Sequence, residues 1–177
     1  MIILLGISGS GKGTQAALLA KHMGIETISI GELLRAHRDE DEIKNRLAAG
    51  VLVDDGVIFP MLENEIKKIG NDFILDGFPR NMEQAKWLVS KIKAGNFNLR
   101  AILHIELPNM VAMERLLARK REDDTRQSIE TRFREQYEEV MLPIISYLNR
   151  QGFKIYEING NQAAEEVAAE IREVLEA

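Results

Sequence analysis

A glycine-rich segment near the N-terminus constrains this chain more than any other feature of its sequence. The run G-I-S-G-S-G-K-G-T occupies residues 6–14, directly after the apolar stretch Met1–Leu5 and at the start of an amphipathic stretch that begins at Lys12. Glycines at this spacing let backbone N–H groups converge on an anion, because no Cβ blocks its approach. The segment therefore predicts a strand, an anion-binding loop and a helix, in that order along the chain.

The lysine in this segment completes the phosphate-binding pattern G-x-x-x-x-G-K. The positive end of the helix dipole near Lys12 adds to the backbone donors, and the lysine ammonium supplies a mobile charge for the outer phosphates. The strict pattern has Ser or Thr directly after the lysine, whereas here Gly13 follows and Thr14 comes next. A glycine-rich turn without a ligand is the alternative, but a strand before the loop and a helix after it are the context that the motif requires. We expect a nucleoside triphosphate site, whose type the loop alone leaves open.

Apolar runs of strand length alternate with helical patterns along the whole chain. The runs lack polar alternation, which is typical of strands in a parallel sheet that is covered on both faces. Because 177 residues is the size of one domain, the sequence predicts a single α/β domain over residues 1–177, with a five-stranded parallel sheet and helices on both faces. Pro60 and Pro143 lie inside two of the helical patterns and are expected to kink or delay them. The expected strands are Met1–Leu5, Glu26–Ile30, Phe73–Leu75, Ala101–Leu107 and Phe153–Ile158, and the expected helices are Lys12–Met23, Gly31–Arg38, Asp41–Ala49, Asp55–Ile69, Met82–Lys93, Asn109–Lys120, Thr125–Arg150 and Ala163–Glu176.

Composition and charge exclude several classes of partner. The net charge is −5, which disfavours a general binder of nucleic acid or of acidic membranes. No run approaches the roughly 20 apolar residues of a membrane span, and no basic residues precede the apolar start, as they would in a signal peptide. The chain has no cysteine, which rules out disulfides and thiolate zinc sites. We therefore expect a cytoplasmic protein with no nucleic-acid partner, no membrane partner and no zinc.

A second informative segment, D-F-I-L-D-G-F-P-R-N-M-E-Q-A, covers residues 72–85. Its apolar strand ends at Asp76, which places that carboxylate at the carboxyl edge of the sheet, where open α/β folds bind ligands. A carboxylate there can hold the waters of a Mg²⁺ ion, which prefers oxygen ligands and keeps much of its hydration shell. By itself Asp76 would serve a turn or a helix cap equally well, but beside a phosphate loop the magnesium role is favoured. Gly77 would bend the chain and Pro79 stiffen it, so that Arg80 lies at the same edge.

Four segments together resemble the adenylate kinase family of nucleoside monophosphate kinases. They are G-I-S-G-S-G-K-G-T-Q from Gly6, S-I-G-E-L-L-R-A from Ser29, D-G-F-P-R from Asp76 and R-E-D-D from Arg121. Their order and spacing also match, and the resemblance covers essentially the whole chain. In that family a glycine and then a threonine usually follow the lysine, as they do here. The resemblance implies a P-loop three-layer fold, the reaction ATP + AMP ⇌ 2 ADP, and Mg²⁺ as the cofactor.

The resemblance also implies a site that is divided between two nucleotides. The loop and Lys12 would hold the ATP phosphates, Asp76 would bind the hydrated Mg²⁺, and Arg35 and Arg80 would grip the AMP phosphate. Gln84 would read the AMP base, and a small helical AMP-binding subdomain would span about residues 30–53. The full ATP set is Gly9, Ser10, Gly11, Lys12, Gly13, Thr14, Arg115, Arg119 and Gln162, and the full AMP set is Ile30, Arg35, Val51, Leu52, Val53, Gly77, Phe78, Pro79, Arg80, Gln84, Arg121 and Arg132.

Arginines are concentrated between Arg115 and Arg134. Arg134 follows Glu130 by four residues, which is typical of an ordinary pair on a helix surface. Arg115 and Arg119 are instead four residues apart with the same charge, which costs roughly a few tenths of a kcal/mol unless an anion intervenes. Planar guanidinium groups suit such an anion, because their N–H groups match phosphate oxygens in pairs.

For this arginine cluster the resemblance implies definite roles. Arg115 would stack on the ATP adenine and Arg119 would reach the ATP phosphates. Arg121 and Arg132 would close on the phosphates around the transfer point, oriented by the acidic pair at residues 123–124. The catalytic set would then be Lys12, Asp76, Arg80, Arg119, Arg121 and Arg132. The segment 160–162 would give backbone contacts to the ATP adenine, with a plain turn between strand and helix as an equal alternative.

The chain departs from the family pattern at two places. Ile30 stands where adenylate kinases usually carry Thr and the similar pyrimidine monophosphate kinases carry Ala. Family members also insert a mobile lid between the arginines that correspond to Arg119 and Arg121, whereas here Lys120 alone separates them. Residues 119–124 would thus be a vestigial lid.

Three functions are compatible with these features. Adenylate kinase is the leading one, with ATP, AMP and ADP as its small-molecule partners and a monomer or small homo-oligomer as its form. A kinase for UMP or CMP is the nearest alternative, but those enzymes tend to have Asn where this chain has Gln84. The third is an assembly switch or pseudoenzyme that binds ATP without transfer. The second arginine clamp speaks against it, because a binding module does not need one.

Overall fold

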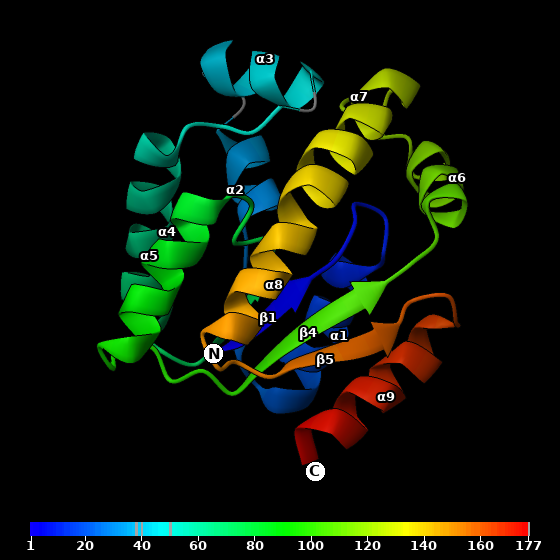
Figure 1. The fold of residues 1–177 in the computed structure, drawn as a ribbon. Coiled ribbons are helices and arrows are strands. Elements are labelled where there is room, and N and C mark those ends of the chain that lie inside the picture. Colours follow the sequence, from blue (N-terminus) through cyan, green and yellow to red (C-terminus); the bar gives the residue numbers. More distant parts are fainter. Residues whose placement is uncertain (38, 40, 50, 177) are drawn as a thin grey trace.

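The computed structural model describes residues 1–37, 39, 41–49 and 51–176. A five-stranded sheet lies at its centre, and all of its strand pairings are parallel (Figure 1). The order across the sheet is β2-β3-β1-β4-β5. The strands are β1 (Ile2–Leu5), β2 (Glu26–Ser29), β3 (Phe73–Asp76), β4 (Ala101–Glu106) and β5 (Ile155–Asn159). The predicted α/β fold with a five-stranded parallel sheet is confirmed.

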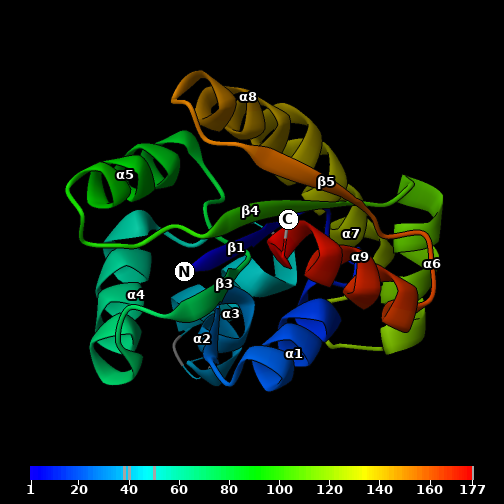
Figure 2. The same ribbon diagram turned by 90° about the horizontal axis from the view of Figure 1, so that it is seen from below.

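Helices cover both faces of this sheet and so make three layers. Helices α1 and α9 lie on one face, and α5 and α8 lie on the other (Figure 2). In β1, Ile2 and Leu4 pack toward α1 and α9, whereas Ile3 and Leu5 pack toward α5 and α8, which is why the strand is apolar at every position. The helices are α1 (Lys12–Met23), α2 (Ile30–Ala36), α3 (Asp41–Ala49), α4 (Asp55–Ile69), α5 (Met82–Lys93), α6 (Asn109–Arg119), α7 (Arg126–Thr131), the π-helical η1 (Arg132–Met141), α8 (Leu142–Arg150) and α9 (Ala164–Glu176).

The prediction of one α-helix over residues 125–150 is wrong in its middle. The ten residues of η1 before α8 are wound as a π-helix, in which the N–H of Leu142 donates to the carbonyl of Tyr137, five residues back. Pro143 has no N–H to donate and its ring crowds the preceding turn, so a widened turn upstream relieves the helix there. By contrast, α4 begins at Asp55 as predicted and includes Pro60.

Some predicted boundaries also differ from the observed ones. Strand β5 starts at Ile155 instead of Phe153, because the N–H of Phe153 donates to the carbonyl of Leu148 and belongs to the turn after α8. The expected helix Gly31–Arg38 is observed as Ile30–Ala36, and its expected end lies outside the described residues. Helix α6 ends at Arg119, because Lys120 takes a left-handed backbone conformation with φ 55°.

The strand register brings polar residues together at the carboxyl edge of the sheet. Asp76 ends β3 and lies opposite Leu4 of β1 on one side and Ser29, the last residue of β2, on the other. The glycine-rich loop follows β1 directly, so it starts beside Asp76. The sheet therefore positions the loop, a carboxylate and a hydroxyl within one short stretch of its edge.

Three further findings concern parts of the chain away from this edge. Trp87 is stacked on Phe59 with ring centroids 5.1 Å apart. Arg134 pairs with Glu135 at 2.8 Å and not with Glu130, which corrects the pairing expected four residues back. Within the described part of the chain, none of the helices is long and apolar enough to cross a membrane.

Candidate active site

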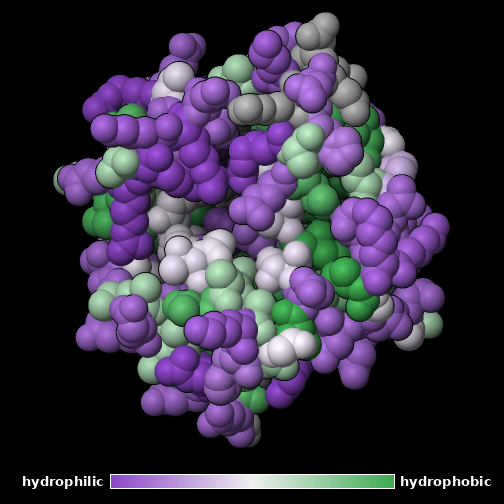
Figure 3. All heavy atoms as spheres, turned by 180° about the vertical axis from the view of Figure 1, so that it is seen from behind, coloured by the Kyte–Doolittle hydropathy of each residue, from purple (hydrophilic) through white to green (hydrophobic). Residues whose placement is uncertain are grey.

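A cavity of about 620 Å³ opens at the carboxyl edge of the sheet. Seen from behind, the molecule is hollowed near its centre, and strongly hydrophilic side chains border much of the hollow (Figure 3). The cavity wall brings together segments that are far apart in the chain: the glycine-rich loop, the end of β3, α2, the end of α3, the arginines after β4 and the turn after β5. The predicted residues that line it are Gly9, Ser10, Gly11, Lys12, Gly13, Thr14, Arg35, Val51, Asp76, Arg80, Arg115, Arg119, Arg121, Arg132 and Gln162.

The glycine-rich loop forms part of the cavity wall. Gly11 caps α1 with φ 96°, a conformation that L side chains rarely adopt, and no atom lies within 4 Å of the place that a Cβ would occupy there. The Nζ of Lys12 donates to the carbonyl oxygens of Gly6 and Ile7, each at 2.8 Å, and so holds the loop in a curl. The first turn of α1 carries no acidic residue, so its N-terminus offers backbone donors and a positive dipole to an anion.

The surroundings of Lys12 weaken its hold on its proton. Burial lowers the pKa of Lys12 from its usual 10.5 to about 8, opposed by the charge of Asp76 and assisted by those of Arg80 and Arg119. A phosphate group beside the ammonium would reverse this shift, because an opposite charge favours the protonated form.

We expect the affinity for ATP to fall as the pH rises through about 8, since the neutral amine loses its attraction for phosphate. Calorimetric titration with ATP between pH 7 and 9.5 measures this, and Lys12→Met should bind weakly with a flat profile over that range. The stability of the nucleotide-free protein should move the other way. Because the folded pKa lies below the unfolded one, the unfolded chain holds more protons, and this group adds stability as the pH rises from about 8 toward 10.5. A wild-type ATP affinity that does not change with pH would contradict the assignment.

Asp76 offers a carboxylate oxygen that no side chain of the described residues satisfies. Its Oδ2 accepts a hydrogen bond from the Oγ of Ser29 at 3.2 Å, whereas its Oδ1 is buried and has no partner. A buried acceptor without a partner is costly, so this position suits a cation or its bound water. The oxygen atoms available here belong to the Asp76 carboxylate and the Ser29 hydroxyl, and oxygen ligands are those that Mg²⁺ prefers. The residues present therefore fit a magnesium ion held through water.

Two arginines, Arg35 and Arg80, lie close together in the space left by two glycines. The Nε of Arg80 donates to the carbonyl of Gly77 at 2.6 Å, and a Cβ at residue 77 would lie 2.7 Å from an Nη of Arg80. A Cβ at Gly31 would lie 3.3 Å from both Nη atoms of Arg35. Burial lowers the pKa of Arg80, and so do the charges of Arg35 and Arg132, against the opposing charge of Asp76. Such crowding of cations is unfavourable without an anion and favours a phosphate site.

We expect Gly31→Ala to raise the KM for AMP about three- to tenfold, because the new methyl group must push the Arg35 fork out of position by a few tenths of an ångström. The same change should stabilise the protein by up to about 1 kcal/mol, since alanine is the better helix residue in α2. Steady-state kinetics and thermal unfolding test the two signs together. An equal rise in the KM for ATP would mean that the substitution acts on the whole cavity and not on Arg35.

A network around Asp124 fixes the arginines that follow β4. Asp124, whose side chain is fully buried, accepts from the Nε and Nη2 of Arg119 at 2.8 and 3.1 Å and from the Nη2 of Arg132 at 3.1 Å. The same nitrogen of Arg132 also donates to the carbonyl oxygen of Asp123 at 2.5 Å. That oxygen accepts a second hydrogen bond from the Oγ of Ser128, also at 2.5 Å. Burial would raise the pKa of Asp124, but the hydrogen bonds and charges of the two arginines outweigh it and hold that pKa below its usual value. The guanidinium groups are thus held in place without a ligand.

In another part of the cavity wall, a hydrogen bond joins α6 to the turn after β5. The Nη1 of Arg115 donates to the carbonyl of Gly160 at 3.1 Å, and Gln162 donates from its Nε2 to Asn159 O and to Glu170 at 3.0 and 2.9 Å. Arg115, Gly160 and Gln162 all line the cavity. The arrangement leaves an arginine face and backbone groups at the side where the resemblance implies an adenine, and these roles stay predictions.

The structure does not bring all predicted AMP residues to the cavity wall. Gln84 is 2% exposed, and its amide is engaged by Asp55 and by the N–H of Arg80 at 2.6 Å each. The side chains of Ile30, Val53 and Phe78 are buried in the core. Leu52 offers its carbonyl to Arg46 instead, at 2.8 Å. The predicted residues that are not among the lining residues of this cavity are Ile30, Leu52, Val53, Gly77, Phe78, Pro79 and Gln84.

Sequence reasoning also missed several residues that shape the cavity. Ser29 binds Asp76, and the β2–β3 register that joins them could not be read from the sequence. Leu47 of α3 and Gln136 of η1 line the wall because of how their helices pack. Away from the cavity, a group of one histidine and two glutamates (His104, Glu106 and Glu157) lies close enough to hold a metal ion, which no sequence pattern indicated. The two ring nitrogens of His104 already contact Glu157 at 2.7 Å and Tyr137 at 3.0 Å, so both of its polar atoms have partners.

Comparison with known proteins adds a family to this geometry. A family model described as adenylate kinase matches residues 4–153. The protein named adenylate kinase 1 of Synechocystis sp. is 38% identical over an alignment of 181 positions, which covers 98% of this chain and 96% of that protein. The adenylate kinase of Corynebacterium aurimucosum is 38% identical over 172 residues, 93% of each chain. Adenylate kinase 1 of Nostoc sp. is 34% identical over an alignment of 181 positions, which covers 98% of this chain and 97% of that protein.

Proposed function

This chain belongs to the adenylate kinase family and is a nucleoside monophosphate kinase, hence a phosphotransferase, and we propose that its cavity carries out the reaction ATP + AMP ⇌ 2 ADP. The observation that carries the proposal is the presence of two cationic anion sites in one cavity. The loop with Lys12 offers one of them, and the pair of Arg35 with Arg80, beside Gly31, offers the other. Phosphoryl transfer asks little covalent chemistry of a protein, but it needs two nucleotides in line and their charge neutralised.

The residues around the transfer point divide this task. Lys12 and the loop amides hold the ATP phosphates, while the forks of Arg35 and Arg80 hold the AMP phosphate and aim one of its oxygens at the γ-phosphorus. Arg119 and Arg132 are held by Asp124 and present their remaining N–H groups to the phosphoryl group as it is transferred. Arg121, which also lines the cavity, assists them. Asp76 would hold Mg²⁺ through water, and the ion would neutralise the charge on the ATP phosphates.

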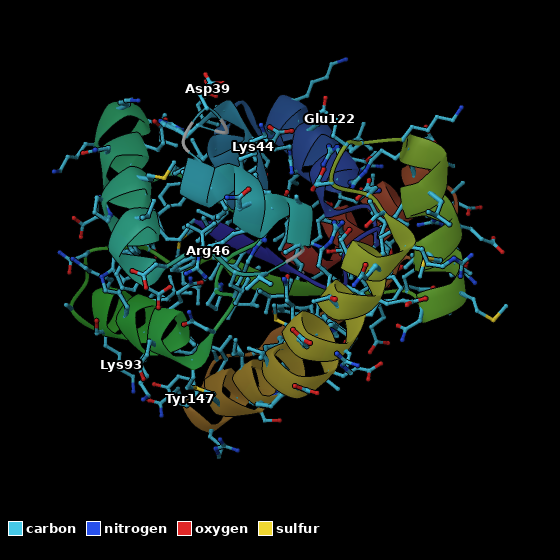
Figure 4. The ribbon with its side chains drawn as sticks, turned by 90° about the horizontal axis from the view of Figure 1, so that it is seen from above. Asp39, Lys44, Arg46, Lys93, Glu122 and Tyr147 are labelled. Atoms are coloured by element: carbon cyan, nitrogen blue, oxygen red, sulfur yellow. The ribbon has the colours of Figure 1, made fainter. Side chains whose placement is uncertain are left out.

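Two segments would form the AMP-binding subdomain and the lid. Residues 30–53, with α2 and α3, serve as the AMP-binding subdomain, and residues 119–124 serve as a vestigial lid that consists of the corner at Lys120. Support comes from helix α3, which lies across the top of the molecule and reaches α7 (Figure 4). With α3 against α7 above the cavity, cover over the nucleotides comes from packed helices instead of from a long mobile insertion.

The location and partners of the protein form a second part of the proposal. We propose that the protein acts in the cytoplasm on ATP, AMP and ADP, without a nucleic-acid or membrane partner, as a monomer or a small homo-oligomer. The net charge of −5 supports the lack of a polyanionic partner.

A coupled assay with ATP and Mg²⁺ against AMP, CMP, UMP and GMP in turn tests the proposal. We expect rapid ADP formation with AMP and much slower reaction with the other three. Faster turnover with CMP or UMP would make the protein a pyrimidine monophosphate kinase. Tight ATP binding without transfer to any of them would make it a nucleotide-binding switch.

A further inference from the structure

Gln84 is held in a single amide orientation by two partners of opposite kind. Its Nε2 donates to Oδ1 of Asp55 at 2.6 Å, and its Oε1 accepts from the backbone N–H of Arg80 at 2.6 Å. Turning the amide over would set Oε1 against the Asp55 carboxylate and the NH₂ group against the Arg80 N–H. Both contacts would then be repulsive, in a place where the side chain is only 2% exposed.

Asp55 is itself fixed by the elements on which it lies. It stands in the first turn of α4, and both of its carboxylate oxygens accept from the Nδ2 of Asn81 at 2.9 and 3.0 Å. Asn81 in turn caps α5 and accepts from the backbone N–H of Gln84 at 2.8 Å. The starts of two helices thus clamp one carboxylate against one amide. A carboxylate acceptor makes the hydrogen bond from Nε2 stronger than one to a neutral oxygen.

The locked amide keeps one N–H and one lone pair unused by these two partners, because an amide group has two donors and its oxygen has two acceptor sites. This pair matches a base that offers an amino group beside a ring nitrogen acceptor, as adenine and cytosine do. It opposes a base that offers an oxo group beside a ring N–H, as hypoxanthine, guanine and uracil do. Size would separate adenine from cytosine, but only the amide orientation separates adenine from hypoxanthine.

We propose that Asp55 is a positioning residue that sets the base selectivity of the monophosphate site, by locking the amide of Gln84 so that amino-bearing bases are accepted and oxo-bearing bases are rejected. The inference rests on the proposed function, in which Gln84 reads the base of the monophosphate. It assigns to Asp55 no contact with the nucleotide. Its effect passes through the amide alone.

The test compares AMP with IMP, which are the same size and differ in the donor and acceptor pattern at this edge. For the wild-type protein we expect kcat/KM with AMP to exceed that with IMP at least about 10²-fold, since a mismatched pair leaves buried groups unpaired. In Asp55→Asn the side chain can donate or accept, so the amide of Gln84 is free to turn over. The AMP to IMP ratio should fall about ten- to a hundredfold, the worth of one charge-assisted hydrogen bond, while the KM for ATP stays within twofold.

Two further variants keep the test decisive. Asp54→Asn removes a carboxylate from the same helix start, where Asp54 caps Gly56 and does not touch Gln84, and its AMP to IMP ratio should match that of the wild type. Asn81→Ser keeps a capping side chain on α5 but replaces the amide Nδ2, which donates to both oxygens of Asp55, by a shorter hydroxyl, so the ratio should fall in the same direction by a smaller factor. The ratio is taken on one preparation and does not depend on the fraction of active protein, so a loss of stability alone cannot move it.

The outcomes separate the inference from the function on which it rests. A wild-type protein that phosphorylates no monophosphate overturns the proposed function. A protein that uses AMP well but accepts IMP equally overturns the inference and leaves the function standing. An unchanged AMP to IMP ratio in Asp55→Asn also overturns the inference. If Asp55→Asn cannot be obtained folded, an unchanged ratio in Asn81→Ser overturns it in the same way.

Discussion

Replacing Arg80 by alanine should lower the turnover of ATP with AMP by about 10²–10³, the usual effect of removing one electrostatic donor from an active site. Arg80 is crowded by the charges of Arg35 and Arg132 and is aimed into the cavity by its bond to Gly77. Because that bond joins Arg80 only to a residue three positions earlier in the same loop, the fold should survive the change. Initial rates in the coupled assay, with circular dichroism as a check of folding, measure the effect.

Two comparisons sharpen this result. Arg80→Lys keeps the charge but loses the planar fork, so it should recover only part of the lost rate. Arg150→Ala removes an exposed arginine at the end of α8, outside the cavity, and should leave turnover within twofold of the wild type. Near-normal turnover of Arg80→Ala with AMP would show that the phosphate clamp lies elsewhere.

Replacing Asp124 by alanine should lower the free energy of unfolding by about 3 kcal/mol, the lower end for breaking a buried ion pair, because one of its partners is a third exposed. The carboxylate is fully buried and serves Arg119 and Arg132 at once, so its removal takes this ion pair from Arg119 and leaves Arg132 with the longer contact to Asp123 at 4.0 Å. Activity should fall as well, because both guanidinium groups lose the contact that orients them. Urea denaturation measures the stability, and the coupled assay measures the rate.

An exposed pair in the same region gives the matched control. Arg134 and Glu135 lie 2.8 Å apart with side chains 67% and 46% exposed, and Glu135→Ala should change stability by less than about 0.5 kcal/mol. Sulfate should restore more stability to Asp124→Ala than to the wild type, because an anion can replace the lost carboxylate. A loss as small as that of the control would mean that the network does not hold the arginines in place.

The sequence by itself determined the fold class and the place of the phosphate loop, and its resemblance to the adenylate kinase family indicated most of the lining residues. The fold class and the place of the loop depend on short-range chemistry. A strand that is buried on both faces must be apolar throughout, as β1 is, and the loop after such a strand must lie at the sheet edge. Lys12, Asp76 and Arg80 are each within a few residues of a strand end, so their positions are set by the strands that precede them.

Only the tertiary structure decided how those residues are held. The pairing of Asp55 with Gln84 joins two residues 29 positions apart at the starts of two helices, and it clamps the amide for which the resemblance implies a base contact. The π-helical turns of η1 and the contact of α3 with α7 are likewise absent from local periodicity. The physical reason is common to all three. A hydrogen-bond partner or a packing neighbour is chosen by which surfaces meet after the sheet has formed, and residue spacing along the chain carries no record of that meeting.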